Sequence, residues 1–361
     1  MMSNVIFMYS LCHKCVTKTG LAFYLFSCIK ALFFITKRKG KSMIYVLLAL
    51  GLFLLAFGGD TMVSGAVALA KKMGISTLLI GLTLVGFGTS TPELLTSLLA
   101  VFKGSNDIAL GNVVGSNIAN ILLVLGMAAV ITPVTVDMKA FKRDGGFLAL
   151  SCIMLIMALF FGQIGRMMGA VLVAMLIGYI VYSYISDKKQ QKKKKEKCAT
   201  SPSDEIETAP NMPTWLALVK AIGGIALMML GAKLLVDNSI ILARSWGVSE
   251  AVIGLTIVAV GTSLPELATS VMCSIRGHAD VAFGNVVGSN IYNALFILGV
   301  TALFLPITVP ANMSTDVWIM TVVTALLIAI ALWQKRFSRS IGFAFLCVYA
   351  GYNYYLYTLP M

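Results

Sequence analysis

The sequence predicts an all-α integral membrane protein in which ten transmembrane helices form two inverted five-helix repeats. The composition excludes an ordinary soluble domain, because 58% of the 361 residues are hydrophobic, only 12% are charged and the mean hydropathy is +0.90. The apolar runs are about 20 residues long, the length that a helix needs to span a bilayer. A 46-residue block, 81–126, also recurs without gaps as 254–299, at an offset of 173 residues and with 27 identical positions.

The predicted spans fall into two groups of five on either side of a polar linker. They lie near 43–70, 75–102, 107–131, 146–162, 166–186, 214–242, 248–275, 281–305, 316–334 and 341–358. The first repeat is therefore 43–186 and the second is 214–361. The linker 187–213 contains seven lysines, and we expect it to be disordered and cytoplasmic.

Residues 1–42 have no counterpart in the second half of the chain. The apolar run 21–36 is short and contains Lys30, so an eleventh helix and a signal-like segment are both open interpretations. We favour a third, in which the natural chain starts at Met43. Cys12 and Cys15 form a lone CxxC motif without a partner pair, so no zinc site is expected there.

Lysine and arginine residues in the predicted loops give the orientation. With the linker inside, sixteen of them lie in cytoplasmic loops and three in outer loops, as the positive-inside rule requires. The count places Lys139, Lys142 and Arg143 in one cytoplasmic loop, and it puts both ends of the ten-helix core outside. Five spans separate equivalent points of the two copies, so the copies cross the membrane in opposite directions. These loops account for most of the net charge of +13, and we expect no nucleic-acid partner.

The duplicated block contains the hexapeptides GTSTPE (88–93) and GTSLPE (261–266). A proline inside a helix removes one N–H and displaces the carbonyl four residues earlier, which belongs to Gly88 for Pro92 and to Gly261 for Pro265. Carbonyl oxygens freed near mid-membrane are tolerated only where they line a cavity or bind something. The motif therefore predicts an interrupted helix with available backbone oxygens in each repeat.

Each hexapeptide also places a glutamate in an apolar span. Glu93 follows Thr89 by four residues, and Glu266 follows Thr262 by four, so each pair shares a helix face. Carboxylate, hydroxyl and carbonyl oxygens are the ligands that Ca²⁺ takes, about six to eight at a time. The alternative is a proline kink with hydroxyls bonded back to the helix, but it leaves two buried carboxylates unexplained. We expect a cation site centred on the two glutamates.

The block ends in GNVVGSNIAN (111–120) and GNVVGSNIYN (284–293). In each copy, polar side chains spaced by four share one helix face: Asn112, Ser116 and Asn120, and then Asn285, Ser289 and Asn293. For the first asparagine of each set a purely structural role, in which the amide holds neighbouring helices together, is equally open. Asn120 and Asn293 lie deeper in their spans and are the better ligand candidates.

Three further charged residues in the spans are expected to be structural. Asp60 falls on Lys233 under the 173-residue offset, so an ion pair between the repeats is one arrangement. Asp237 lies one turn after Lys233 and offers a local pair instead. The spans contain no Ser/His pair, no Cys/His pair and no HExxH motif, which argues against an enzyme. Nothing in the sequence indicates a cofactor.

The paired GTSxPE and GNVVGSN motifs resemble those of the cation/calcium exchanger superfamily, specifically its bacterial and archaeal sodium/calcium antiporters, over about residues 43–361. The resemblance implies an antiporter that exchanges Na⁺ for Ca²⁺ by alternating access in a prokaryotic plasma membrane. Its partners would be these ions and the lipid bilayer, with no required protein partner. The resemblance implies a Ca²⁺ site at Glu93 and Glu266 with the carbonyls of Thr89 and Thr262. It also implies two flanking Na⁺ sites. The ligands of one would be the Gly86 carbonyl, Thr89, Ser90, Glu93 and Ser289, and those of the other would be the Ala259 carbonyl, Thr262, Ser263, Glu266 and Ser116.

The central amide pair, Asn120 and Asn293, departs from the family pattern. The archaeal exchanger of known structure and the potassium-dependent relatives carry an aspartate where this chain has Asn293, so the resemblance argues against K⁺ coupling. The proton/calcium branch usually has GNxxE where this chain has GNVVG, which argues against H⁺ coupling. An H⁺- or K⁺-coupled antiporter on the same scaffold and, more remotely, a cation channel stay open as alternatives.

Overall fold

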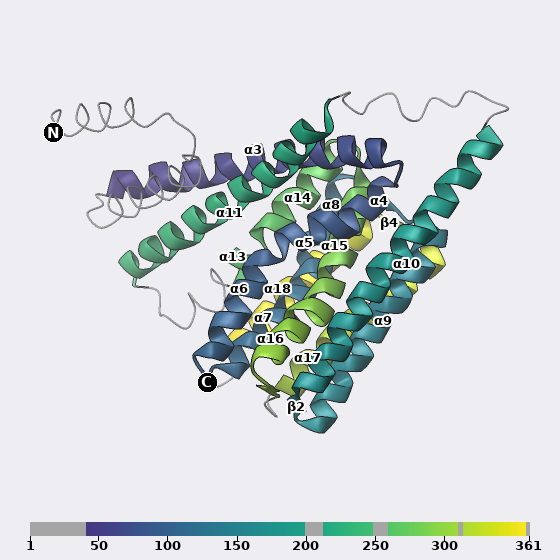
Figure 1. Ribbon diagram of the computed structural model, residues 1–361. Helices are drawn as coiled ribbons and strands as arrows, with labels where there is room; N and C mark the ends of the chain where they lie inside the picture. Colours follow the sequence, from purple (N-terminus) through teal and green to yellow (C-terminus); the bar gives the residue numbers. More distant parts are fainter. Residues whose placement is uncertain (1–40, 199–211, 248–258, 310–312, 359–361) are drawn as a thin grey trace, which may run out of the picture. The chain divides into compact units, whose positions relative to one another are not determined.

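The computed structural model describes residues 41–198, 212–247, 259–309 and 313–358. The chain divides into two compact units, Met1–Leu47 and Leu48–Met361. Of the first unit only the beginning of helix α3 (Lys41–Met73) is described, so the expectations for residues 1–40 lie outside the described residues. The architecture that follows is that of the second unit (Figure 1).

Helices occupy nearly all of the described residues. In the first half they are α4 (Thr77–Ile80), the π-helical η2 (Gly81–Val85), α5 (Gly86–Thr89), α6 (Thr91–Phe102), α7 (Asn106–Ala119), η3 (Asn120–Leu125), α8 (Gly126–Ile131), α9 (Met138–Phe161) and α10 (Arg166–Cys198). In the second half they are α11 (Thr214–Ser245), α13 (Ala259–Thr262), α14 (Leu264–Ile275), α15 (Ala279–Ile291), η5 (Tyr292–Ile297), α16 (Leu298–Phe304), α17 (Ser314–Gln334) and α18 (Arg339–Thr358). The predicted all-helical class is confirmed.

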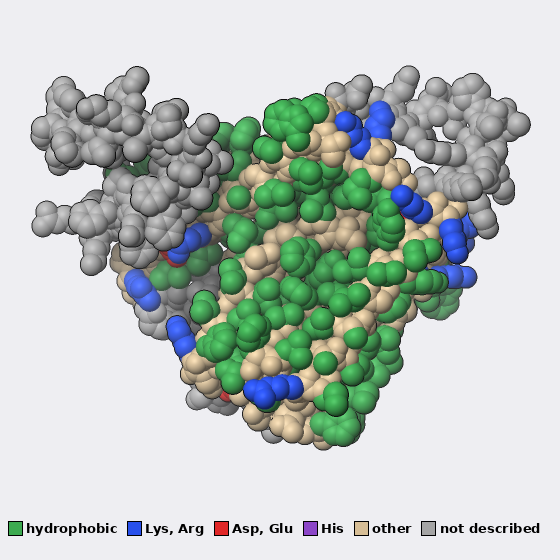
Figure 2. Space-filling model, viewed as in Figure 1, with side chains coloured by type: hydrophobic (Ala, Val, Ile, Leu, Met, Phe, Trp, Pro, Cys, Tyr) green, Lys and Arg blue, Asp and Glu red, His purple; other side chains and the backbone are tan. Residues whose placement is uncertain are grey.

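Seven of the described helices are long and apolar enough to cross a membrane, or eight if the bent pair Thr77–Thr89 and Thr91–Phe102 is one span. The count of ten spans stays a prediction. Figure 2 shows hydrophobic side chains over the middle of one face and lysine and arginine nearer its edges, as expected for a protein surrounded by lipid. The structure therefore agrees with the prediction that the chain crosses the membrane several times.

Two segments that the sequence analysis assigned to a loop or to a disordered linker are helical. Helix α9 begins at Met138 with Asp137 as its N-cap, accepting a hydrogen bond from the Lys139 amide at 2.9 Å. Lys139, Lys142 and Arg143 therefore lie on a helix and not in a loop. The start of the linker is also helical, because α10 continues to Cys198. Lysine, glutamine and glutamate favour helices, and the first proline comes only at residue 202.

Two short antiparallel strand pairs join the halves, and the sequence did not predict them. β1 (Val134–Thr135) pairs with β4 (Arg336–Phe337), and β2 (Gln163–Ile164) pairs with β3 (Ile307–Thr308). Adding 173 to Val134 gives Ile307, and subtracting 173 from Phe337 gives Ile164. The offset therefore converts the contact Val134–Phe337 into the contact Ile307–Ile164. The repeat is thus visible in contacts outside the duplicated block.

The helices that carry the GNVVGSN motifs form the centre of the unit. In the spans Asn106–Ile131 and Ala279–Phe304, 72% and 83% of the most apolar window is buried, against 28–39% in the other spanning helices. Most side chains on these two spans therefore face protein rather than lipid.

Glycines let α3 and α11, which run side by side in Figure 1, approach closely. A Cβ atom at Gly58 would lie 2.8 Å from the Gly224 carbonyl, and one at Gly231 would lie 2.8 Å from the Gly51 carbonyl. Only glycine leaves room for such backbone contact. The two helices therefore form a tightly packed pair.

Candidate cation site

The helix of the first hexapeptide is interrupted, as its sequence predicts. Helices α5 and α6 meet at Ser90, and the segments Thr77–Thr89 and Thr91–Phe102 are bent by 41°. Pro92 lies in the first turn of α6, where its missing N–H leaves no hydrogen bond unmade. In the second hexapeptide Ser263 separates α13 from α14, and Pro265 occupies the same position. Each break places a glutamate in the first turn of the following helix.

Both glutamate side chains are buried, each with 1% of its surface exposed. Neither carboxylate oxygen of Glu93 has a hydrogen-bond partner among the described residues, and Oε2 of Glu266 has none either. Oε1 of Glu266 accepts a hydrogen bond from the Ser90 hydroxyl at 3.4 Å. A hydroxyl of one hexapeptide thus reaches the carboxylate of the other, which brings the two halves together at one place.

Asn112 holds the backbone at the first glutamate. Its Nδ2 donates to the Glu93 carbonyl at 3.1 Å and to the Ser97 hydroxyl at 3.0 Å. The amide thereby fastens α7 to the first turns of α6. Such contacts favour the structural role that the sequence left open for this residue.

Asn285 makes the matching contacts in the second half. Its Nδ2 donates to the Glu266 carbonyl at 3.4 Å and to the Ser270 hydroxyl at 3.1 Å. The Thr89 hydroxyl, which has a single hydrogen to donate, lies 3.3 Å from Oδ1 of Asn285 and 3.1 Å from the Val85 carbonyl. Asn285 therefore contacts both hexapeptides.

Asn120 and Asn293 lie in π-helical turns, a feature frequent at functional sites. Asn120 is the first residue of η3, and Asn293 is the second residue of η5. Nδ2 of Asn120 donates to Oδ1 of Asn290 at 3.3 Å, but its own Oδ1 is without a partner among the described residues. Neither polar atom of the Asn293 side chain has one. Both side chains are almost completely buried.

The predicted ligands of the flanking sites lie on the same elements. A Cβ at Gly86 would lie 3.2 Å from the Ser289 nitrogen, so α5 and α15 are in close contact there. Ser116 is buried on α7, which packs against α13, the helix that runs from Ala259 to Thr262. Ser263 is also buried, and among the described residues its hydroxyl has no partner. The hydroxyl of Ser289 is equally buried and unpaired within the described part of the chain.

These unpaired atoms are unusual because a buried polar group without a hydrogen bond costs about 1–3 kcal/mol. Many of them are the carboxylate, amide and hydroxyl oxygens that Na⁺ and Ca²⁺ bind. The described residues contain no cluster of three or more histidine, cysteine or acidic side chains. The arrangement therefore suits a hard cation held by two carboxylates and neutral oxygens, and it offers no soft ligand for a transition metal. Among the predicted site residues, the unpaired oxygens belong to Glu93, Glu266, Asn120, Asn293, Ser263 and Ser289.

Of the two ion-pair arrangements expected for the charged residues of the spans, the structure contains the local one and not the one between the repeats. Lys233 and Asp237 form the local pair, at 3.0 Å, with both side chains half exposed. Asp60 is paired with Arg276, so the ion pair between Asp60 and Lys233 is not formed. Helix packing decides this, because α3 crosses α14 where Gly59 approaches Met272.

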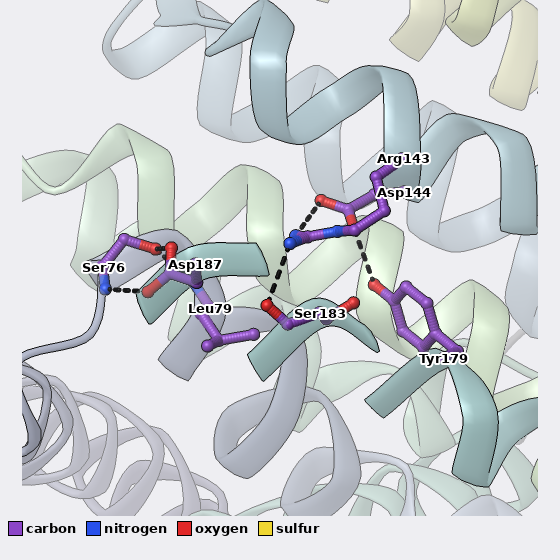
Figure 3. Close-up of polar contacts among 7 residues, drawn as sticks. All are labelled: Ser76, Leu79, Arg143, Asp144, Tyr179, Ser183 and Asp187. Atoms are coloured by element: carbon purple, nitrogen blue, oxygen red, sulfur yellow. Dashed lines mark hydrogen bonds and ion pairs between the residues drawn. The ribbon is translucent and has the colours of Figure 1, made fainter. Parts of the chain in front are cut away.

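A buried polar network away from the glutamates was missed in the sequence (Figure 3). Arg143 donates to both carboxylate oxygens of Asp144, at 2.6 and 2.9 Å, and to the Ser183 carbonyl at 3.1 Å. The Tyr179 hydroxyl donates to Asp144 at 3.2 Å. These contacts fasten α9 to α10. The adjacent opposite charges of Arg143 and Asp144 beside an apolar run were the only signal of this network in the sequence. The signal was not used because Arg143 was assigned to a loop.

Comparison with known proteins gives concordant results. The family described as "Sodium/calcium exchanger protein" matches residues 43–185 and 216–358. The sodium/calcium exchanger MaX1 of Methanosarcina acetivorans is 35% identical over 75% of this chain and 85% of its own length. The inner membrane protein YrbG of Escherichia coli is 33% identical over 80% and 88%. A structure of the sodium-calcium exchanger NCX_Mj superposes with a TM-score of 0.75 and 31% identity, covering 89% of this chain and all of the other.

Proposed function

Because the chain belongs to the sodium/calcium exchanger protein family, a family of membrane cation/calcium antiporters, we propose that it exchanges Na⁺ for Ca²⁺ at a single central site. The site is built from Glu93 and Glu266, with the hydroxyl and amide oxygens described above as further ligands. The observation that carries this proposal is the pair of buried carboxylates with unpaired oxygens. A cation would satisfy them all at once.

The charge of the site accounts for exchange. Two ionised glutamates give a formal charge of −2, which one Ca²⁺ or two Na⁺ neutralise. Both ions require the same oxygens, so one must leave before the other binds, and competition of this kind couples their movements. If more than two Na⁺ move for each Ca²⁺, transport carries current and responds to the membrane potential.

We propose that the fold is ten spans in two inverted repeats. The exchange of the strand contacts by the 173-residue offset supports this arrangement. Backbone contacts of glycines give the same support: a Cβ at Gly126 would lie 3.1 Å from the Gly342 carbonyl, and one at Gly299 would lie 3.1 Å from the Gly169 carbonyl. Each pair becomes the other when 173 is added or subtracted. Such a relation is expected of two repeats about a pseudo-two-fold axis, and transporters of this kind bind their ions at the interface of the repeats.

Alternating access would come from movement of the pair α3 and α11 past the central helices. The glycine contacts between α3 and α11 hold the two helices together, so the pair can move as one body. Lysine-rich α10 would end on the cytoplasmic side, and both ends of the core would lie outside, in the cell membrane. The position of Asn293 in the site favours Na⁺ over K⁺ and H⁺ as the coupling ion, because no third carboxylate is present there.

Uptake of radioactive calcium into proteoliposomes that contain the full chain tests the proposal. We expect uptake when the vesicles are loaded with Na⁺, and none when they are loaded with K⁺ or given a pH step. Uptake driven by the pH step or by K⁺ would show that H⁺ or K⁺ is the coupling ion, and the assignment of the site residues would not change. Calcium entry without any counter-ion gradient would contradict antiport and indicate a channel.

A further inference from the structure

The last asparagine of each GNVVGSN motif, Asn117 in the first half and Asn290 in the second, is not among the predicted ligands of the cation site. Their side chains are 4% and 1% exposed, so the two motifs bury a second pair of amides in the centre of the unit. A buried amide is costly unless its oxygen and its nitrogen find partners. The contacts of these two residues therefore indicate what each of them does.

Asn290 accepts hydrogen bonds from two amides of the first half. Its backbone carbonyl accepts one from Nδ2 of Asn117 at 3.4 Å, and its Oδ1 accepts one from Nδ2 of Asn120 at 3.3 Å. Asn117 and Asn120 lie three residues apart, near the end of α7 and at the start of η3. Asn290, on α15, thus holds this turn of the first half at two points.

The contact between Asn120 and Asn290 decides which end of the Asn120 amide is left for a cation. A carboxamide has an oxygen that attracts a cation at one end and an NH₂ group that repels it at the other. Because Asn290 engages Nδ2 of Asn120, the oxygen is the end without a partner among the described residues. The turn η3 also packs against α14, which carries Glu266 in its first turn. The Asn120 amide therefore has an oxygen to give to a cation at the junction of the two halves.

The repeat supplies a comparison, because adding or subtracting 173 converts the contact Asn120–Asn290 into Asn293–Asn117. The structure does not contain this second contact. Within the described part of the chain, Oδ1 of Asn117 and both polar atoms of the Asn293 side chain are buried without a partner. Nδ2 of Asn117 lies 3.6 Å from Sδ of Met320 on α17. One amide of the central pair is thus held by a neighbouring asparagine, and the other is not.

We propose that Asn290 is a positioning residue for ion binding, which holds the Asn120 amide so that its oxygen and not its nitrogen is presented to the cation. Removing the partner that orients a metal ligand typically lowers metal affinity by about 10- to 100-fold. Asn290 acts on a ligand side chain, whereas Asn112 and Asn285 contact the backbone at the glutamates. The inference rests on the proposed function, because it requires a cation at the central site.

Equilibrium binding of radioactive Ca²⁺ to the purified full chain tests the inference. Asn290→Leu removes both polar atoms and roughly preserves the size of the side chain, and it should raise the dissociation constant for Ca²⁺ by about ten-fold or more. Asn117→Leu is the matched control, because it makes the same change at the repeat-related residue, whose side chain orients neither amide of the central pair. It should change the Ca²⁺ constant by about three-fold at most. Thermal denaturation in detergent checks that both variants fold, and Asn290→Ala makes the same deletion with a smaller side chain if leucine does not fit.

A double substitution separates orientation from packing. A carboxylate has an oxygen at both ends, so Asn120→Asp offers an oxygen to the cation whichever way the side chain turns. The orienting contact is then unnecessary, and in this background Asn290→Leu should change the Ca²⁺ dissociation constant by about three-fold at most. A packing role for Asn290 would instead give the same loss of affinity in both backgrounds.

The outcomes distinguish this inference from the proposed function. Equal losses of Ca²⁺ affinity in the two backgrounds, or in Asn117→Leu and Asn290→Leu, would overturn the inference, because packing would then account for them. Normal Ca²⁺ binding by Asn290→Leu, together with Na⁺-driven Ca²⁺ uptake by the unmodified protein, would overturn the inference and leave the proposed function intact. Absence of Na⁺-driven uptake by the unmodified protein would refute the proposed function itself.

Discussion

Replacing Glu93 by glutamine is the sharpest test of the cation site. The substitution preserves the size of a side chain that is 1% exposed, and it removes one of the two negative charges of the site. Both oxygens of Glu93 lack partners among the described residues, so the protein loses no internal hydrogen bond there. The variant should fold, and the effect should fall on ion binding.

The size of the effect follows from the burial. Removing one member of a buried pair of opposite charges costs about 3–5 kcal/mol, which corresponds to an increase of about 100- to 3000-fold in the dissociation constant for Ca²⁺. Na⁺ has half the charge and about half the Coulomb energy. Its dissociation constant should therefore rise by about ten- to fifty-fold only. The preference of the site should move away from Ca²⁺.

Equilibrium binding of radioactive Ca²⁺ to purified protein, with Na⁺ as competitor, measures both constants, and vesicle uptake measures transport. Asp237→Asn is the matched control, because it removes a carboxylate from a spanning helix at a half-exposed position where the partner is Lys233. This control should bind and transport normally. A Glu93→Gln protein with wild-type uptake and a Ca²⁺ constant within about three-fold of the original would refute the assignment of the site.

Three further outcomes follow from the packing and the hydrogen bonds. Gly224→Ala places a Cβ 2.6 Å from the Gly58 carbonyl and should lower the free energy of unfolding by about 1–3 kcal/mol, whereas Gly223→Ala, with nothing within 4 Å, should not lower it; thermal denaturation in detergent compares the two variants. Asn285→Ala removes the amide that donates to the Glu266 carbonyl and should weaken Ca²⁺ binding by about ten-fold in the same binding assay. Unchanged binding would show that this amide only holds helices together. Arg143→Ala leaves the buried Asp144 carboxylate without an opposite charge, although Tyr179 still donates to it, and should cost about 3–5 kcal/mol of stability. An additional Asp144→Asn substitution should restore most of this stability in a double-mutant cycle.

Much of the candidate site could be predicted because its signals are local. Glu93 and Glu266 are recognisable as single acidic residues in apolar runs, and the prolines beside them mark the helix interruption that is found. Duplication adds information, since it tells which positions of the two halves correspond. The π-helical turns at Asn120 and Asn293 left no signal of this kind, because a π turn differs from an α turn only in which backbone partners meet.

Contacts between distant residues could not be predicted. Asp60 pairs with Arg276 and not with Lys233, and Asp187, taken as the start of a disordered linker, is a buried acceptor for Ser76. Arg143 was assigned to a loop although it lies on α9. Each of these outcomes depends on the angle and height at which two helices cross, and neither quantity can be read from hydropathy.

The sequence by itself determined that the chain is a multi-span membrane protein, that it contains a duplicated half, and that a glutamate occupies the same place in each copy. Burial in lipid dictates apolar runs, and duplication leaves matched motifs, so both are written along the chain. Only the tertiary structure decided which polar atoms remain unpaired and which charges meet. Hydrogen bonds and ion pairs act over a few ångströms, and helix packing alone brings residues from distant parts of the chain within that range.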